Sequence, residues 1–207
     1  AVVLPENRGV LVVGGHRDGE HLASTELLDL DTETFSPGPL MESIRCGCGT
    51  AALEDGRVVL VGGSAGTAIS TTEVLNPARN TWSLGPNLST ARSGCSAVPL
   101  SNGRILAIGG KRAFSSRSCL STTEVIDLAS EISAPGPEMS CPRFSCTAIM
   151  LHDNRVLVIG GRNSTMNSLA TTEILDLASG ISSPGPVMDI ARCGASATLL
   201  PEDGGVL

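Results

Sequence analysis

Pairs of adjacent glycines recur along the chain at nearly constant intervals, and this recurrence constrains the fold more than any other feature. Successive pairs lie 48, 47 and 51 residues apart, at Gly14-Gly15, Gly62-Gly63, Gly109-Gly110 and Gly160-Gly161. A period of this length indicates an array of similar units, in which each unit buries its apolar surface against its neighbours. The sequence therefore predicts a repeat protein with one unit per glycine pair.

The other parts of the repeat keep the same order in every unit. About ten residues after each glycine pair comes a segment that contains a glutamate, namely STELLDL (24–30), TTEVLNP (71–77), TTEVIDL (122–128) or TTEILDL (171–177). A turn of the type SPGP or SLGP follows, and each unit then ends on Met-x-x-x-Arg or Leu-x-x-x-Arg. The closing arginines are Arg45, Arg92, Arg143 and Arg192.

The residue types within each unit predict β-strands. Short segments rich in Val, Ile, Leu and Thr alternate with Gly, Pro, Asn and Asp, and no segment keeps a 3.6-residue period long enough for a helix. The segment RVVLVGG (57–63) is continuously apolar, which is typical of a strand that is buried on both faces. We therefore expect one four-stranded antiparallel sheet per unit, with the sheets stacked around an axis.

These residues resemble a known family. The glycine doublet, the downstream glutamate strand, the aromatic position of Phe35 and Trp82 and the closing Met-x-x-x-Arg are similar to the kelch repeat, and residues 91–110 are similar to the units of the galactose oxidase-like superfamily. The resemblance implies an all-β, kelch-type β-propeller. This chain departs from the pattern where Ile132 and Ile181 replace the aromatic residue, so we expect looser packing there.

The repeats divide the chain into four blades and the beginning of another. The approximate repeats are 1–46, 47–93, 94–144 and 145–193, and a further repeat starts within 194–207. Ala1–Leu11 and Ala195–Leu207 occupy the same phase, so the chain starts and stops within a repeat. We expect a single kelch propeller fragment, an incomplete open arc of four four-stranded antiparallel blades, with more blades in a longer protein.

The order of the strands sorts the charged residues onto two faces. If the strands of a blade are named a to d, the b–c loops and d–a connections emerge together, and they carry nine cations and five anions. The opposite face carries five cations and twelve anions, and four strand glutamates are left unassigned. An acidic chain of net charge −7 could thus present a basic face of about +4.

We interpret the b–c and d–a loop face as a binding surface for a protein or peptide, with an acidic segment as the specific hypothesis. Kelch propellers resemble one another in using these loops for partners, and arginine can form two hydrogen bonds to one carboxylate. The candidate residues are Arg17, Lys111, Arg112, Phe114, Arg117, Arg162, Asn163, Arg45, Arg92, Arg143 and Arg192. For the four repeated arginines the alternative is a structural role, in which they pair with the repeated glutamate or with loop carbonyls.

Several other functions receive less support from the residues. The alternative to an interaction scaffold is the propeller of a carbohydrate-active or oxidase-like enzyme whose chemistry lies outside this segment, since galactose oxidase and sialidases use tyrosines and this chain has none. We expect no catalytic residue, cofactor or metal, because His16, His21 and His152 lie far apart in the repeat. The charge argues against nucleic acid, and no segment is long enough to span a membrane. The seven cysteines form no CxxC pair and have no matched His spacing for zinc, which favours reduced thiols in a cytosol-like compartment.

Overall fold

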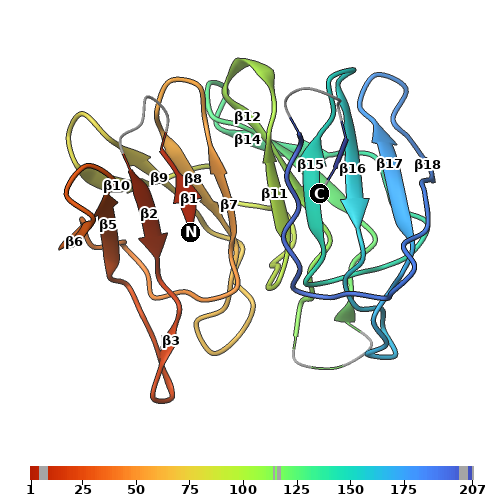
Figure 1. The fold of residues 1–207 in the computed structure, drawn as a ribbon, viewed down its shortest axis with the longest axis horizontal. Helices are drawn as coiled ribbons and strands as arrows, with labels where there is room; N and C mark the ends of the chain where they lie inside the picture. The colour runs from red at the N-terminus through yellow and green to blue at the C-terminus, as the bar shows by residue number, and fades with distance from the viewer. Residues whose placement is uncertain (5–8, 114, 116–117, 201–204, 207) are drawn as a thin grey trace.

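The computed structural model describes residues 1–4, 9–113, 115, 118–200 and 205–206, and it is built from strands. Four antiparallel four-stranded sheets follow one another along the chain (Figure 1). The first sheet contains β1 (Val2–Val3), β2 (Val10–Val13), β5 (Thr25–Asp29) and β6 (Thr34–Pro37). The second contains β7 (Gly49–Ala52), β8 (Val58–Val61), β9 (Thr72–Asn76) and β10 (Thr81–Leu84).

The two remaining sheets have the same meander order. The third contains β11 (Ser96–Pro99), β12 (Arg104–Ile108), β13 (Thr123–Asp127) and β14 (Ile132–Pro135). The fourth contains β15 (Thr147–Met150), β16 (Arg155–Ile159), β17 (Thr172–Asp176) and β18 (Ile181–Pro184). A small hairpin of β3 (His16–Arg17) and β4 (Glu20–His21) extends from the first sheet.

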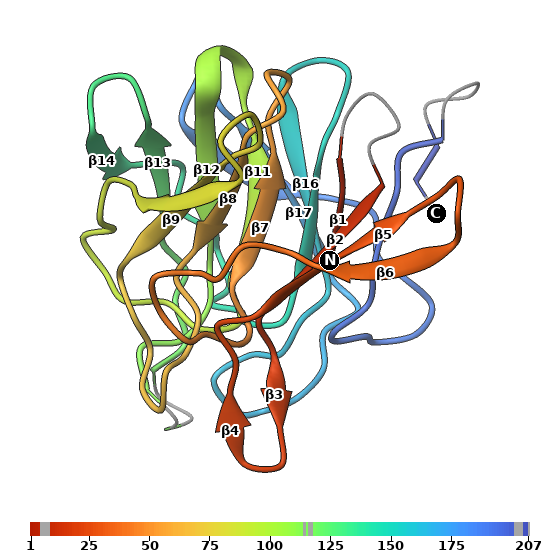
Figure 2. The same ribbon diagram turned by 90° about the vertical axis from the view of Figure 1, so that its left-hand side faces the viewer.

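The sheets stand side by side as the blades of a propeller that does not close (Figures 1 and 2). The first strands of neighbouring blades contact one another, β1 with β7, β7 with β11 and β11 with β15. This arrangement confirms the all-β fold and the open arc of four blades. In the described part of the chain, no helix is long and apolar enough to cross a membrane.

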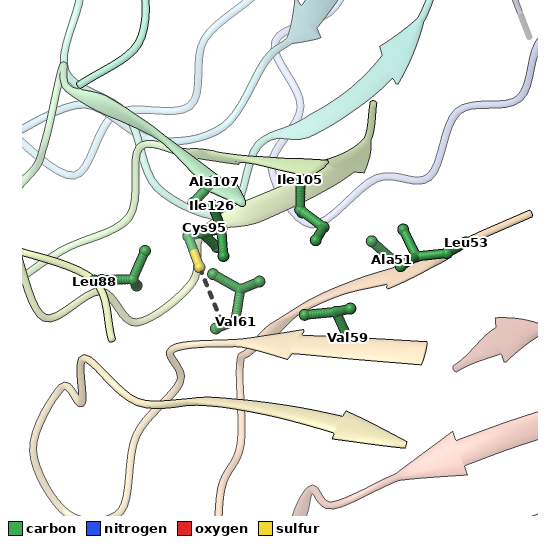
Figure 3. Close-up of a cluster of buried hydrophobic side chains, with 9 residues drawn as sticks. All are labelled: Ala51, Leu53, Val59, Val61, Leu88, Cys95, Ile105, Ala107 and Ile126. Carbon is green, nitrogen blue, oxygen red and sulfur yellow. Dashed lines mark hydrogen bonds between the residues drawn. The ribbon is translucent and has the colours of Figure 1, made fainter. Parts of the chain in front are cut away.

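The apolar core lies between the blades rather than within one of them. Three clusters of buried side chains fill the three interfaces between successive blades. In the interface between the second and third blades, Val59 and Val61 of β8 face Ile105 and Ala107 of β12 (Figure 3). A single repeat cannot bury its apolar faces alone, so packing between blades supplies most of the stability.

The glycine doublets are required by their backbone geometry. At Gly109 φ is +61°, and a Cβ there would lie 2.3 Å from the carbonyl oxygen of Arg143. The amide of the next residue, Gly110, donates a hydrogen bond of 2.9 Å to that same oxygen. The doublet therefore joins the end of strand b to the closing arginine of its own blade, and the same contact recurs in every blade.

Candidate functional site

The closing arginines of the first three blades lie between blades. Arg45, Arg92 and Arg143 are fully buried, and each forms an ion pair with the strand glutamate of the following blade. The pairs are Arg45 with Glu73, Arg92 with Glu124 and Arg143 with Glu173. Each guanidinium also donates to a carbonyl of the glycine doublet, as Arg143 does to Gly160 at 2.9 Å.

Backbone amides complete the site around each glutamate. Glu173 accepts hydrogen bonds of 2.7 Å from the amide of Ser140 and 3.2 Å from that of Cys141. These two residues lie inside the Met-x-x-x-Arg segment that also supplies Arg143. The segment is thus a carboxylate-binding element, in which two amides and a guanidinium hold the glutamate of the next blade.

Hydrogen bonding sets the ionisation of these glutamates. Burial disfavours the charged form of Glu173, but the Ser140 amide, the Ser182 hydroxyl and Arg143 outweigh burial, so its pKa lies below the usual value. Glu124 behaves in the same way, because the amide of Ser89, Arg92 and Ser133 overcome its burial and lower its pKa. Both carboxylates are therefore charged at neutral pH, as an ion pair requires.

Three of the four repeated arginines have a structural role, which was the alternative to a role in binding. The contacts of Arg45, Arg92 and Arg143 are those expected of it, a repeated glutamate and loop carbonyls. A partner at the surface has no access to a guanidinium that is fully buried. Arg192, the fourth member, is exposed.

The b–c loops of the blades emerge together along the lower edge of Figure 1, where the β3–β4 hairpin projects. Arg17 lies on that hairpin and forms an exposed ion pair of 3.4 Å with Asp18. The b–c loop of the third blade carries Lys111 and Arg112, and that of the fourth carries Arg162 and Asn163. Candidates Phe114 and Arg117 lie outside the described residues.

Phe144 contacts both Lys111, through its side chain, and Arg162, through its backbone. The Nζ atom of Lys111 lies 4.9 Å from the centroid of the Phe144 ring, within the range of a cation–π contact. Arg162 pairs with Phe144 through two backbone hydrogen bonds, of 3.0 and 2.8 Å. Phe144 is almost fully buried, and it contacts the side chain of Lys111 and the backbone of Arg162.

The loops of the third and fourth blades are also joined by their side chains. The thiol of Cys119 interacts with the hydroxyl of Ser164, which partly offsets the rise in its pKa that burial causes. Arg162 donates from Nε to the sulfur of Cys193 at 3.1 Å. Asn163 holds its own loop, since its side-chain oxygen accepts hydrogen bonds from the amides of Thr165 and Asn167. We therefore interpret Asn163 as a positioning residue.

Assigning the strand glutamates changes the charge of the loop face. Three of its nine cations are neutralised inside the fold by Glu73, Glu124 and Glu173. The count of 9 − 5 then becomes 9 − 5 − 3, or about +1, once these three strand glutamates are added to it. The positive charge of the loop face is therefore confined to a few residues and does not cover the whole face. We name the group of Lys111, Arg112 and Arg162 the basic cluster.

Two residues of this region were absent from the sequence-based candidates. Phe144 directly follows Arg143, where the other units have Cys46, Ser93 and Cys193, so its departure from the repeat was the available signal. Cys193 could not be identified from the sequence, because its contact is with Arg162, which lies 31 residues away along the chain. Among the described residues, no group of three His, Cys, Asp or Glu side chains is arranged to hold a metal ion.

Comparison with known families agrees with the geometry. The family model of the kelch motif matches residues 44–89, which run from just before the first interblade arginine to the end of the second blade. The match covers one of the four repeats, and the repeated four-stranded sheets are consistent with a kelch-repeat propeller fragment. Kelch domains in general bind proteins and are non-enzymatic. No curated protein matches the chain.

Proposed function

We propose that this chain is an interaction scaffold that binds an acidic segment of a partner protein through the loop face of its third and fourth blades. The observation that carries the proposal is that Phe144 contacts the side chain of Lys111 and is paired through its backbone with Arg162 of the neighbouring loop. The proposal assigns no catalytic step to these residues.

The geometry suits recognition of carboxylates. Arg112 is exposed and lies next to Lys111 in the sequence, and Arg162 belongs to the neighbouring blade. Because these positions belong to loops fixed by hydrogen-bonded backbone, little conformational entropy is lost when a partner binds. Loops that vary over a fixed scaffold are the usual location of binding residues.

The partner is expected to be a protein rather than a nucleic acid. Nucleic acid binding needs an extended basic surface to displace counterions along the phosphates, whereas the basic cluster is compact and the whole chain is acidic. An acidic peptide a few residues long fits a compact site. Electrostatic attraction of this kind mainly speeds association and weakens with added salt.

The test is binding of a labelled oligoglutamate peptide, measured by fluorescence anisotropy at low and high salt. We expect the triple variant Lys111→Glu/Arg112→Glu/Arg162→Glu to bind at least about tenfold more weakly than the wild type at low salt. The matched control is Arg79→Glu/Arg104→Glu/Arg155→Glu, which makes the same change in net charge on the opposite face.

The control variant separates a local site from a general effect of charge. Binding by the control should equal that of the wild type, and circular dichroism should show that all three proteins are folded. Equal binding by the wild type and the basic-cluster variant at low salt would contradict the proposal. Equal losses in both variants would show that only net charge matters.

A further inference from the structure

A crevice of about 500 Å³ lies between the third and fourth blades, on the face of the a–b and c–d turns that form the upper edge of Figure 1. Leu100, Val125, Met150 and Leu177 give it apolar walls, and Arg104 also lines it. Among the described residues that line the crevice, none is an aspartate or a glutamate. Both walls belong to four-stranded sheets that pack against each other within the chain.

Arg104 lacks the acidic partner that its counterparts have. In the second and fourth blades, an aspartate of the a–b turn binds the arginine that follows it by two residues. The pairs are Asp55 with Arg57 at 2.8 Å and Asp153 with Arg155 at 2.7 Å. Asn102 occupies the position of the aspartate in the third blade. Arg104 therefore forms no ion pair with a described residue, and its Nε atom donates only a long hydrogen bond of 3.5 Å to the carbonyl oxygen of Ser101.

The carboxylate that strand pairing places beside Arg104 is that of Asp127. Its Oδ1 atom accepts hydrogen bonds from the amides of Ala129 and Ser130, at 2.8 and 3.1 Å. The amides of Ser130 and Ala129 are the main causes that lower the pKa of Asp127, and Arg104 contributes least. Asp127 is thus held by its own turn, which leaves the guanidinium of Arg104 available to a ligand.

A second crevice, between the second and third blades, provides a comparison within the same molecule. It has a volume of about 400 Å³ and is lined by Arg57, Val74, Leu128 and Glu131, among others. The residues at the same repeat positions of the first crevice are Arg104, Val125, Leu177 and Gly180. In the second crevice Arg57 is already bound to Asp55, and Glu131 adds a negative charge. Of the two, the crevice between the third and fourth blades is the one that suits an anion.

We propose that the crevice between the third and fourth blades binds an aliphatic carboxylate, with the carboxylate at Arg104 and the chain against Leu100, Val125 and Leu177. Arginine can form two hydrogen bonds to one carboxylate. Ser101 and Asn154 line the same crevice and offer further polar groups. Small-molecule sites typically have volumes of about 300 to 1,000 Å³ and combine apolar walls with a few polar groups.

The site is separate from the basic cluster, which lies on the opposite face. Oligoglutamate has no aliphatic chain to fill the crevice, so the two proposals are tested independently. An aliphatic carboxylate occurs both in free acids and at the C-terminus of a peptide that ends in an apolar residue. Octanoate represents the first source and N-acetylleucine the second.

The test is isothermal titration calorimetry of the whole 207-residue chain with each of these two acids and with its neutral amide. We expect at least one acid to bind, and its amide to bind at least about tenfold more weakly, because the amide loses the charged hydrogen bonds to arginine. The acid that binds more tightly identifies the source. Absence of binding by both acids, or equal binding of acid and amide, would overturn the proposal.

Substitution of the arginine locates the ligand. Arg104→Gln should bind the acid at least about tenfold more weakly than the wild type. Arg57→Gln is the matched control, since it makes the same change in the other crevice, and it should bind as the wild type does. Circular dichroism checks that both variants are folded. Equal affinities of Arg104→Gln and the wild type, or equal losses in the two variants, would contradict the assignment.

A second pair of variants tests the crevice without removing the arginine. Gly180→Glu and Gly180→Gln place side chains of equal size where the other crevice has Glu131. The backbone accommodates them, since Glu33 and Glu131 have φ values of +55° and +58° at this repeat position. Gly180→Glu should bind the acid about threefold more weakly than Gly180→Gln, because like charges repel. Equal affinities of these two variants would mean that the ligand lies outside the crevice.

Discussion

Arg143 of the third blade donates a hydrogen bond of 2.6 Å to Glu173 of the fourth, although the two residues lie 30 positions apart in the sequence. The pair is buried, and the glutamate is also held by two amides of the segment that ends in Arg143. Equivalent pairs occupy the two earlier interfaces. The polar contacts between blades therefore run in one direction, from each closing arginine to the glutamate that follows it.

Replacing Arg143 with alanine should destabilise the fold. Removal of one partner from a buried pair leaves the other charge uncompensated, which costs about 3 to 5 kcal/mol. The free energy of unfolding, measured with denaturant, should fall by that amount in Arg143→Ala. The exposed Arg79→Ala is the control and should change it by less than about 0.5 kcal/mol. An unchanged unfolding midpoint for Arg143→Ala would return this arginine to the candidates for binding.

The stability of the chain should decrease at acid pH. The pKa of Glu124 and of Glu173 in the folded state lies below the ordinary value of 4.5 for a glutamate, so protons bind more tightly to the unfolded chain. Their contribution is present above pH 4.5 and is lost as the pH falls through the lowered folded values. Urea unfolding from neutral to acid pH measures this loss. The Glu173→Gln variant should show a shallower dependence, and an equal slope would argue against the pair as its source.

The period of the glycine doublets was sufficient to predict the four sheets and the open arc. Each unit repeats the same strand and turn residues, so local propensity and long-range packing agree. The geometry of a doublet such as Gly109-Gly110, with positive φ values, explains why only glycine occurs there. The strands, the turns and the glycine doublets depend on residues within one repeat, so they can be predicted from a single sequence.

Contacts between repeats could be predicted only in part. The sequence suggested that the arginines pair with the repeated glutamates, but Arg45 lies 19 residues after Glu26 and 28 before Glu73, and spacing alone does not choose between them. The packing of the second blade against the first places Glu73, and not Glu26, beside Arg45. The sequence also left the strand glutamates unassigned to either face, because the burial of three arginines beside them depends on the neighbouring blade.

A methyl group at Gly109 should destabilise the third blade. Its φ of +61° is unfavourable for alanine, and the new Cβ would lie 2.3 Å from the backbone oxygen of Arg143. We expect Gly109→Ala to lose at least about 1 to 3 kcal/mol of stability in thermal or urea unfolding. Gly180→Ala is the control, because φ there is +73° but nothing lies within 4 Å of its Cβ. Equal losses in the two variants would show that backbone conformation alone is responsible, without the contact to Arg143.

The thiols should react in an order set by their surroundings. Burial raises the pKa of Cys95 to about 11 and that of Cys146 to about 12, so both are protonated and inaccessible. Hydrogen bonds from Ser168 and then Arg162 lower the pKa of Cys193. Because the thiolate is the reactive form, iodoacetamide at about pH 8 should modify Cys193 long before Cys95 and Cys146, as mass spectrometry of the peptides would show.

Arg162→Ala should slow the reaction of Cys193 alone. Rapid modification of Cys146 without denaturant would mean that the interface between the third and fourth blades opens readily.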